Sequence, residues 1–395
     1  MVQHATLLLF CGRFLYNMSG VALSKKTSLT HFTALVFHPH SLVIIYTLSS
    51  PSKNDLEISS YHTNALIEEG AKFKPEKDRY HLFVAYACPW ANRALIVRAM
   101  KGLEDVIGYT AVHPTWVKTK PDDPTDKHTG WRFCSTPEDE EPPFHNSIGQ
   151  GGPFSPTVEG CEPNPLFDSY TVRDIYEQAN DTDGKYTVPI LWDKKLHTIV
   201  SNESSEIIQM LSSEFNEFAT NPTLDLNPKY LQDEMAAVDE WIYTNLNNGV
   251  YRCGFAKAQS AYNDAIEDLT TAFDQVDTIL QNQRFIAGDQ ITLSDIRLFV
   301  TLVRFDEVYA VYFKTNTRSV AHTPAILNYC REIYQMPGVK DTIKMDQIKQ
   351  HYYTSHPHLN PFSVIPKGIG FVKLLEEPHD RDSLHKRAKI VTHVD

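Results

Sequence analysis

One cysteine of this chain lies where a thiol could do chemistry. Cys88 falls between a strand-like run, "YHLFVAY", and a helix-like run, "WANRALIVRAM", with Pro89 directly after it. Unpaired backbone N–H groups and the dipole at a helix N-terminus favour a thiolate, and proline fits the first helical turn. The sequence therefore predicts that the pKa of Cys88 is lowered. Because residue 91 is Ala91, no resolving cysteine follows, and a mixed disulfide at Cys88 would need an external thiol.

The six cysteines are widely scattered and form neither a CxxC pair nor a zinc-type spacing. This pattern argues against a disulfide framework and against a zinc site, so we expect no metal. Apart from Cys88, we interpret the cysteines as buried or incidental thiols. They are Cys11, Cys134, Cys161, Cys253 and Cys330.

Composition is that of an ordinary soluble protein, with 42% hydrophobic and 22% charged residues in 395. That length allows two or more domains. The formal net charge of -12 argues against general affinity for nucleic acid or anionic lipid, which needs clustered Lys and Arg. The apolar patches "ATLLLF" and "SLVIIY" are shorter than the ~20 residues that span a bilayer, so we expect no transmembrane helix.

The elements that must position Cys88 alternate between strands and helices. After the first strand and helix, "VIGYTAV" predicts a second strand, and a βαβ unit is the economical interpretation. Further along, "LFDSYTVRDIYEQA" predicts a helix, and "VPILWD" and "HTIV" predict two strands joined by a turn. The next helix should begin near Ser204, with Ser201 or Asn202 as its cap. The order βαβαββα is typical of a thioredoxin-like domain, which we place at residues 77–220.

A long insertion interrupts this domain at residues 114–165. It holds ten of the 23 prolines, an acidic run "EDEEPP" and the glycines of "IGQGGP". Such a segment cannot form the interior of helices or strands, so we expect a long loop. The pattern leaves open whether the loop is a spacer or a binding lid.

Helices alone are expected after the stretch "FATNPTLDLNP", so we assign residues 226–395 to an all-helical domain with a C-terminal extension. The clearest start signal is a capping box of Thr292 and Asp295, with Ile291 and Ile296 as a hydrophobic staple. The predicted helices lie near 228–248, 260–283, 293–312 and 324–335.

The first 54 residues contain no Asp or Glu and are rich in Ser, Thr and aliphatic residues. This is the acid-poor composition of an organelle transit peptide, although a cleaved signal or an unusual tail fits equally well. We therefore expect a cytoplasmic protein, or a mitochondrial or plastid one if residues 1–54 act as a transit peptide.

Seven ordered motifs resemble a known family. They are "ACPWA", "VPILWDKK", "TIVSNESSEII", "NNGVYRCGFA", "LVRFDEVY", "YQMPGV" and "HYYTSHPHLNP". Together they resemble the glutathionyl-hydroquinone reductases, also called the Xi class of glutathione transferases, from about residue 77 to 382. The resemblance implies an α/β thioredoxin-like N-terminal domain followed by an all-α C-terminal domain, the glutathione transferase fold. It also implies a homodimer.

The resemblance assigns glutathione-binding roles to several residues. Pro189 matches a cis-proline that faces the cysteine, so the backbone of Val188 would pair with the cysteinyl peptide of glutathione. Glu203 and Ser204 match the pair that holds the γ-glutamyl end. Trp131 matches a tryptophan that reaches the peptide from the insertion, although an indole there could instead serve packing alone.

Three tyrosines match family positions around the sulfur. Tyr251 would exchange a proton with the aromatic substrate, while Tyr309 and Tyr352 would stabilise the thiolate by hydrogen bonding. Lys185 stands where the family commonly has Arg, so a bidentate contact to glutathione is in doubt there.

The resemblance implies glutathione-dependent reduction of glutathionyl-hydroquinones to hydroquinones, with glutathione as cosubstrate and glutathione disulfide as product. Two alternatives stay open. An omega-like thiol transferase or dehydroascorbate reductase would share Cys88 but would not require the three tyrosines. A non-catalytic transferase-like domain that binds a partner would need no reactive thiol.

Overall fold

The computed structural model describes residues 72–384, Ile67, Gly70 and three short strands near the N-terminus. It divides into two compact units, Met1–Ser59 and Ser60–Asp395. The first unit contributes an antiparallel sheet in the order β1-β2-β3. The remaining residues of 1–54, on which the targeting prediction falls, lie outside the described residues. The three strands are Val21–Ala22, Phe32–Val36 and Ile44–Leu48.

The second unit is built around a four-stranded sheet in the order β5-β4-β8-β9. Strand β4 (Tyr80–Val84) pairs in parallel with β5 (Gly108–Ala111), and α1 (Pro89–Lys101) forms the crossover between them. Strands β8 (Ile190–Asp193) and β9 (Thr198–Ser201) continue the sheet in antiparallel pairing. Cys88 therefore lies directly before the first helix of a thioredoxin-like sheet, as the sequence predicts.

Helix α3 (Ser204–Ser213) begins where the sequence places it, but its cap differs. Neither Ser201 nor Asn202 is the N-cap. Glu203 holds that position, and its carboxylate accepts the Ser205 N–H at 3.0 Å. A carboxylate at a helix N-terminus is favoured by the exposed N–H groups and by the dipole. Helix α2 (Val172–Gln178) is shorter than the predicted run "LFDSYTVRDIYEQA".

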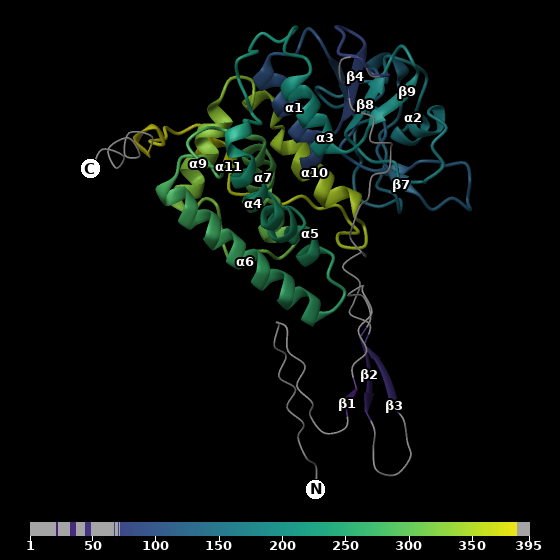
Figure 1. Ribbon diagram of the computed structural model, residues 1–395. Coiled ribbons are helices and arrows are strands. Elements are labelled where there is room, and N and C mark those ends of the chain that lie inside the picture. The colour runs from purple at the N-terminus through teal and green to yellow at the C-terminus, as the bar shows by residue number, and fades with distance from the viewer. Residues whose placement is uncertain are drawn as a thin grey trace. The chain divides into compact units, whose positions relative to one another are not determined.

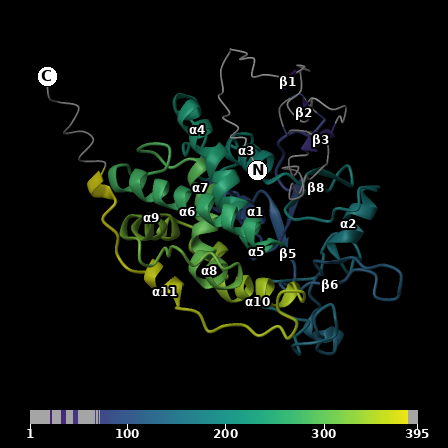
Figure 2. The same cartoon turned by 90° about the horizontal axis from the view of Figure 1, so that it is seen from below.

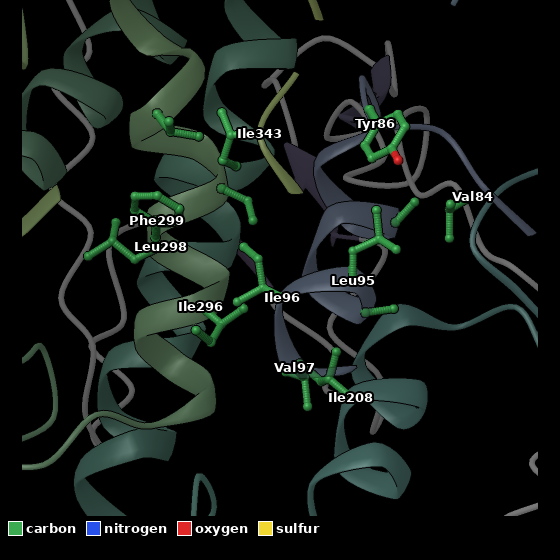
Figure 3. Close-up of a cluster of buried hydrophobic side chains, with 14 of the residues drawn as sticks. Val84, Tyr86, Leu95, Ile96, Val97, Ile208, Ile296, Leu298, Phe299 and Ile343 are labelled. Atoms are coloured by element: carbon green, nitrogen blue, oxygen red, sulfur yellow. The ribbon is translucent and has the colours of Figure 1, made fainter. Parts of the chain in front are cut away.

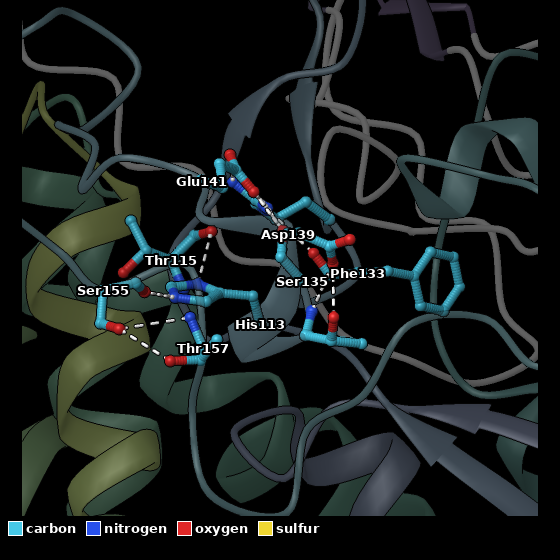
Figure 4. Close-up of polar contacts among 10 residues, drawn as sticks. His113, Thr115, Phe133, Ser135, Asp139, Glu141, Ser155 and Thr157 are labelled. Carbon is cyan, nitrogen blue, oxygen red and sulfur yellow. Dashed lines mark hydrogen bonds and ion pairs between the residues drawn. The ribbon is translucent and has the colours of Figure 1, made fainter.

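The insertion contains little regular structure, as its prolines require. Its only elements are two-residue strands and one short helical turn, and polar contacts hold the rest (Figure 4). At its start, His113 accepts the Thr115 N–H at 2.9 Å through Nδ1 and donates to the Ser155 carbonyl at 3.0 Å through Nε2. These bonds require a neutral ring, and burial lowers the pKa of His113 to about 4. The elements are β6 (Val117–Lys118), β7 (Thr129–Gly130) and η1 (Pro137–Asp139).

Helices alone follow residue 202 among the described residues, as predicted for the second half of the chain. The Thr292 and Asp295 capping box forms at the start of its helix, with the Thr292 N–H donating to Asp295 at 2.8 Å. The sequence misses α5, α10 and α11. The elements are η2 (Lys229–Leu231), α4 (Gln232–Ile242), η3 (Tyr243–Asn247), α5 (Gly249–Gly254), α6 (Gln259–Asn282), α7 (Leu293–Arg304), η4 (Phe305–Tyr309), α8 (Ala310–Tyr312), α9 (Pro324–Gln335), η5 (Lys340–Thr342), α10 (Met345–Ser355) and α11 (Phe371–Leu375).

Helix α1 is the shared wall between the sheet and the helices. Figures 1 and 2 show the sheet and α2 to one side of α1, and helices α6, α7 and α9 to the other. Figure 3 shows Ile96 of α1 facing Ile296 of α7, while Val97 lies beside Ile208 of α3. All four side chains are fully buried, and the burial of each stabilises the folded protein by roughly 1.5–3 kcal/mol. This packing fixes the helix that carries Cys88 at its N-terminus.

Two features are absent from the described residues. None of their helices combines the length and the apolar character needed to cross a membrane. Within the same residues, no group of three or more His, Cys, Asp and Glu side chains is arranged to hold a metal ion.

Candidate active site

The Cys88 thiol lies at the junction of the sheet and the first helix. Cys88 is the N-cap of α1, with extended backbone (φ -73°, ψ 119°), and Pro89 occupies the first turn. The thiol donates to the Val188 carbonyl at 3.4 Å. The Val188–Pro189 peptide bond is cis, which confirms the prediction for Pro189. The sulfur therefore faces the loop that leads into β8.

The prediction of a lowered Cys88 pKa is wrong. Burial raises the pKa of the thiol, because a thiolate loses its hydration there. The backbone N–H groups of Trp90 and Ala91 and the guanidinium groups of Arg304 and Arg93 oppose this effect without overcoming it. The helix N-terminus acts in the predicted direction, but the sequence gives no measure of how deeply the sulfur is buried.

The N-terminus of α3 lies against α1. Arg93, one turn and a half beyond Cys88, donates to the Ser204 hydroxyl at 3.3 Å and to the Asn247 side chain at 2.9 Å. The Ser204 hydroxyl lies 3.4 Å from a Glu203 carboxylate oxygen. A carboxylate, a hydroxyl and free N–H groups at a helix start can bind an ammonium and a carboxylate side by side. The predicted pair Glu203 and Ser204 is therefore adjacent and tied to the cysteine-bearing helix.

The three predicted tyrosines meet although they come from three separate elements. Tyr251 of α5 and Tyr352 of α10 have hydroxyls 2.6 Å apart, and the Tyr309 hydroxyl of η4 is 2.9 Å from that of Tyr352. Burial raises the pKa of all three phenols. Cys88 is close enough that its charge also raises the pKa of Tyr251 and Tyr309. The cluster is therefore a set of neutral phenols that can donate protons beside the thiol.

Residues 87–214 match the family model "Glutathione S-transferase, N-terminal domain", and residues 259–332 match "Glutathione S-transferase, C-terminal domain". Over 311 residues the chain is 39% identical to glutathionyl-hydroquinone reductase YqjG of Escherichia coli strain K12, covering 78% of this chain and 84% of that protein. The chain belongs to the Xi class of glutathione transferases, the glutathionyl-hydroquinone reductase family. The predicted fold class is confirmed.

Solved structures of this Xi class agree. Glutathione transferase Xi 1 from Trametes versicolor superposes with a TM-score of 0.69 at 40% identity, covering 79% of this chain and 99% of that one. The glutathione-bound structure of E. coli YqjG gives 0.69 at 37% identity, covering 79% and 91%. A further relative, glutathione S-transferase omega-like 2 of Schizosaccharomyces pombe (strain 972 / ATCC 24843), is 36% identical, covering 79% of this chain and 92% of that protein.

An aromatic wall surrounds the phenols in this Xi-class transferase. Measured between ring centroids, Trp90 lies 5.2 Å and Phe313 lies 5.3 Å from Tyr251. Phe255 packs at 5.1 Å from Phe313 and at 5.5 Å from the His356 ring. Such a wall suits a flat aromatic ligand, because rings gain from offset and edge contacts. The sequence analysis did not single out these residues, although Trp90, Phe255 and His356 lie inside its motifs.

Trp131 and Lys185 are placed differently from the phenols. Trp131 is buried, and its ring stacks on His351 of α10 with centroids 4.4 Å apart and meets Trp116 edge-on. The packing alternative for Trp131 thus has direct support, and its role toward glutathione stays a prediction. Lys185 is exposed on the segment between α2 and β8, ahead of Val188. A lysine there can offer one point charge to a carboxylate, without the fork of an arginine.

The insertion is anchored to α10. Its Thr115 hydroxyl lies 2.9 Å from that of Thr354, the Trp116 N–H donates to Ser355 at 3.0 Å, and His351 donates to the Pro114 carbonyl at 2.9 Å. Sequence reasoning left the insertion as either a spacer or a lid. These contacts tie its start to the same helix that carries Tyr352.

Proposed function

We propose that this protein is a glutathionyl-hydroquinone reductase. The observation that carries the proposal is the single thiol of Cys88, which lies beside the Val188 carbonyl and close to a cluster of three neutral phenols. A thiol without a resolving cysteine suits transfer of glutathione, and a phenol donor suits an aromatic leaving group. The E. coli relative, named as a glutathionyl-hydroquinone reductase, supports the same activity.

In this proposal residues 77–220 bind glutathione. The Val188 backbone pairs with its cysteinyl peptide, while Glu203 and Ser204 hold the ammonium and carboxylate of its γ-glutamyl end. Lys185 and Trp131 contribute to the same tripeptide. The glutathione-bound structure of the E. coli relative supports glutathione as the cosubstrate. Residues 226–395 supply the tyrosines, and homodimer formation is part of the proposal.

The first half-reaction exchanges one bond to sulfur for another. The Cys88 thiolate attacks the glutathione sulfur of the glutathionyl-hydroquinone, so that a Cys88 to glutathione disulfide forms and the bond between sulfur and the ring carbon breaks. The electron pair of that bond goes to the ring carbon, which takes a proton from Tyr251. Hydroquinone leaves, and the phenol of Tyr251 regains its proton from solvent.

The second half-reaction restores the enzyme. The thiolate of a second glutathione attacks the glutathionyl sulfur of the mixed disulfide, forms glutathione disulfide and releases the Cys88 thiolate. One glutathionyl-hydroquinone and one glutathione thus give one hydroquinone and one glutathione disulfide. Tyr309 and Tyr352 donate hydrogen bonds to the thiolate in both halves.

A turnover assay tests this function. Purified full-length protein is mixed with a glutathionyl-hydroquinone and glutathione, and the products are separated by chromatography. We expect hydroquinone and glutathione disulfide in equal amounts. Reduction of a small glutathione mixed disulfide or of dehydroascorbate without any hydroquinone would instead support the omega-like alternative, and the absence of all turnover would favour a partner-binding module.

A further inference from the structure

Arg304, the last residue of α7, reaches across to the turn that precedes Cys88. Its side chain is fully buried. Nε donates to the Ala87 carbonyl at 3.1 Å, and Nη2 donates to the Tyr86 carbonyl at 2.9 Å and to the Asn92 side-chain oxygen at 3.1 Å. Nη1 donates to the Val300 carbonyl in its own helix at 2.7 Å. One guanidinium therefore holds the two residues before the cysteine and the first turn after it.

Among residues 72–384, no carboxylate lies within ion-pairing distance of the Arg304 guanidinium. Within residues 72–384, all of its hydrogen bonds go to carbonyl and amide oxygens, and it forms no ion pair. Arg132, also fully buried, shows the contrast, because its guanidinium pairs with Glu141 at 2.6 Å. A buried cation costs several kcal/mol unless an opposite charge or a full set of hydrogen bonds offsets its lost hydration. The carbonyl oxygens offset part of that cost and leave the positive charge unneutralised.

We propose that Arg304 is a positioning residue for Cys88: it fixes the turn that presents the sulfur and supplies the positive charge that the thiolate faces. The inference rests on the proposed function only in taking Cys88 as the nucleophile. Cys88 is half-buried, and the loss of hydration at its sulfur disfavours the ionised form, so a nearby fixed charge affects the pKa of the thiol more than it would in water. Burial raises the pKa of Tyr309 and Tyr352, and the charge of Arg304 opposes that rise without overcoming it, so the same charge also acts on two phenols of the cluster.

A purely structural role would explain the hydrogen bonds of Arg304 to the turn before Cys88, but not its effect on the ionisation of the thiol. Two substitutions separate the hydrogen bonds from the charge. Arg304→Met removes both the charge and the hydrogen bonds, whereas Arg304→Lys keeps the charge and loses the forked geometry. The readout is the rate of Cys88 alkylation by iodoacetamide against pH in the free enzyme, with Cys88→Ser as background. It needs neither glutathione nor a hydroquinone, so it remains interpretable if the proposed activity is wrong.

We expect Arg304→Met to move the midpoint of the alkylation profile upward and to slow alkylation at pH 7.5 by about tenfold, which corresponds to one pKa unit. Arg304→Lys should keep the wild-type midpoint, while amide hydrogen exchange of residues 85–88 becomes faster. An unchanged midpoint in a folded Arg304→Met protein overturns the charge role. A midpoint that shifts equally in both variants overturns it too.

Loss of a buried arginine can also prevent folding, which melting temperatures will show. If Arg304→Met does not fold, Arg304→Lys still decides the case. A wild-type midpoint with faster exchange at residues 85–88 supports the proposal. Unchanged exchange at that turn, or a raised midpoint despite the retained charge, overturns it.

Discussion

The hydroxyl of Tyr251 lies 2.6 Å from the hydroxyl of Tyr352, and Tyr352 also contacts the hydroxyl of Tyr309 at 2.9 Å. Each phenol carries one hydroxyl proton, which it can donate either to a neighbouring hydroxyl or to a group outside the cluster. Burial raises the pKa of all three, which keeps them protonated at neutral pH. The cluster is therefore a set of linked, protonated phenols that can donate a proton to a substrate beside it.

This relationship makes the Tyr251 hydroxyl a specific target. Tyr251→Phe keeps the ring contacts with Trp90 and Phe313 but deletes the proton donor. We expect glutathionyl-hydroquinone reduction to fall by ~10² to 10⁴, the usual contribution of a general acid. Cleavage of a small glutathione mixed disulfide needs no proton on carbon, so that activity should stay within a few-fold. Steady-state rates with both substrates provide the measurement.

The matched control is Tyr262→Phe, which removes a hydroxyl that donates to the Lys314 carbonyl away from the cluster. Both activities should survive in that variant. If Tyr251→Phe lowers both activities together, Tyr251 serves glutathione binding or thiolate stabilisation. If it lowers neither, the hydroxyl is structural and the role inferred from the family does not apply.

Cys88→Ser should abolish hydroquinone release, because a hydroxyl is scarcely ionised at neutral pH and is a poor nucleophile toward sulfur. Wild-type protein treated with a glutathionyl-hydroquinone alone should gain one glutathione, which peptide mass spectrometry should locate at Cys88. Cys330→Ala, in the buried core of α9, serves as the control and should retain both the adduct and the turnover. A Cys88→Ser protein that keeps most of its rate would refute the assignment.

The sequence predicts the elements that carry the site well, because the residues at the start of each of these helices determine where it begins. A strand, a cysteine and a proline at the start of an amphipathic helix give the place of Cys88, and the capping box of Thr292 and Asp295 gives the start of α7. The ionisation of the thiol could not be predicted in the same way. It depends on burial and on Arg304, which lies more than two hundred residues away along the chain.

Helix α10 and the packing of Trp131 could not be predicted either, because they too depend on contacts between distant segments. Helix α10 carries Tyr352 in the run "MDQIKQHYYTS", where buried polar residues hide the apolar periodicity that would mark a helix. Several of those polar residues are buried because the insertion satisfies their hydrogen bonds, as His351 and Ser355 show. A contact between segments so far apart in the chain leaves no local pattern. The same holds for the stacking of Trp131 on His351.

Removing residues 1–50 should leave catalysis and the melting temperature of the remaining chain nearly unchanged. All assigned site residues lie within 72–384, and the chain divides into separate compact units near Ser59. Termini are commonly dispensable unless they dock on the fold. The measurement compares kcat/KM and thermal melting of the truncated and full-length proteins. Loss of soluble protein on truncation would show that the segment packs on the rest.

A fluorescent fusion to residues 1–54 tests the targeting prediction separately. Import of the fusion into mitochondria or plastids would support a transit peptide, as the acid-poor composition suggests. A diffuse cytosolic signal would reject organelle import. The full-length chain with the same fluorescent protein at its C-terminus is the control, because it shows where the natural context places the protein.

Acid should destabilise the folded protein through its buried histidines. Burial lowers the pKa of His113 to about 4 and that of His356 to about 4, against 6.5 for an exposed histidine. As the pH falls below 6.5, these histidines bind protons in the unfolded chain but not in the folded protein. Their contribution to the free energy of unfolding is therefore fully present above pH 6.5 and is lost as the pH falls toward 4. For His113 alone the loss at pH 5 is about 2 kcal/mol.

Urea unfolding at pH 7.5, 6 and 5 measures this dependence, and His113→Asn isolates one contribution. The variant should be less stable than wild type at pH 7.5, because it loses at least one of the bonds to Thr115 and Ser155. It should also lose less stability between pH 6.5 and 5, by about 2 kcal/mol, since one buried imidazole no longer resists protonation. His322→Asn, at an exposed position, is the control for the exchange of an imidazole for an amide as such. An equal dependence of the unfolding free energy on pH in His113→Asn and wild type would contradict the role of His113. A ring that stays neutral in the folded protein but is protonated in the unfolded chain must lower the stability as the pH falls.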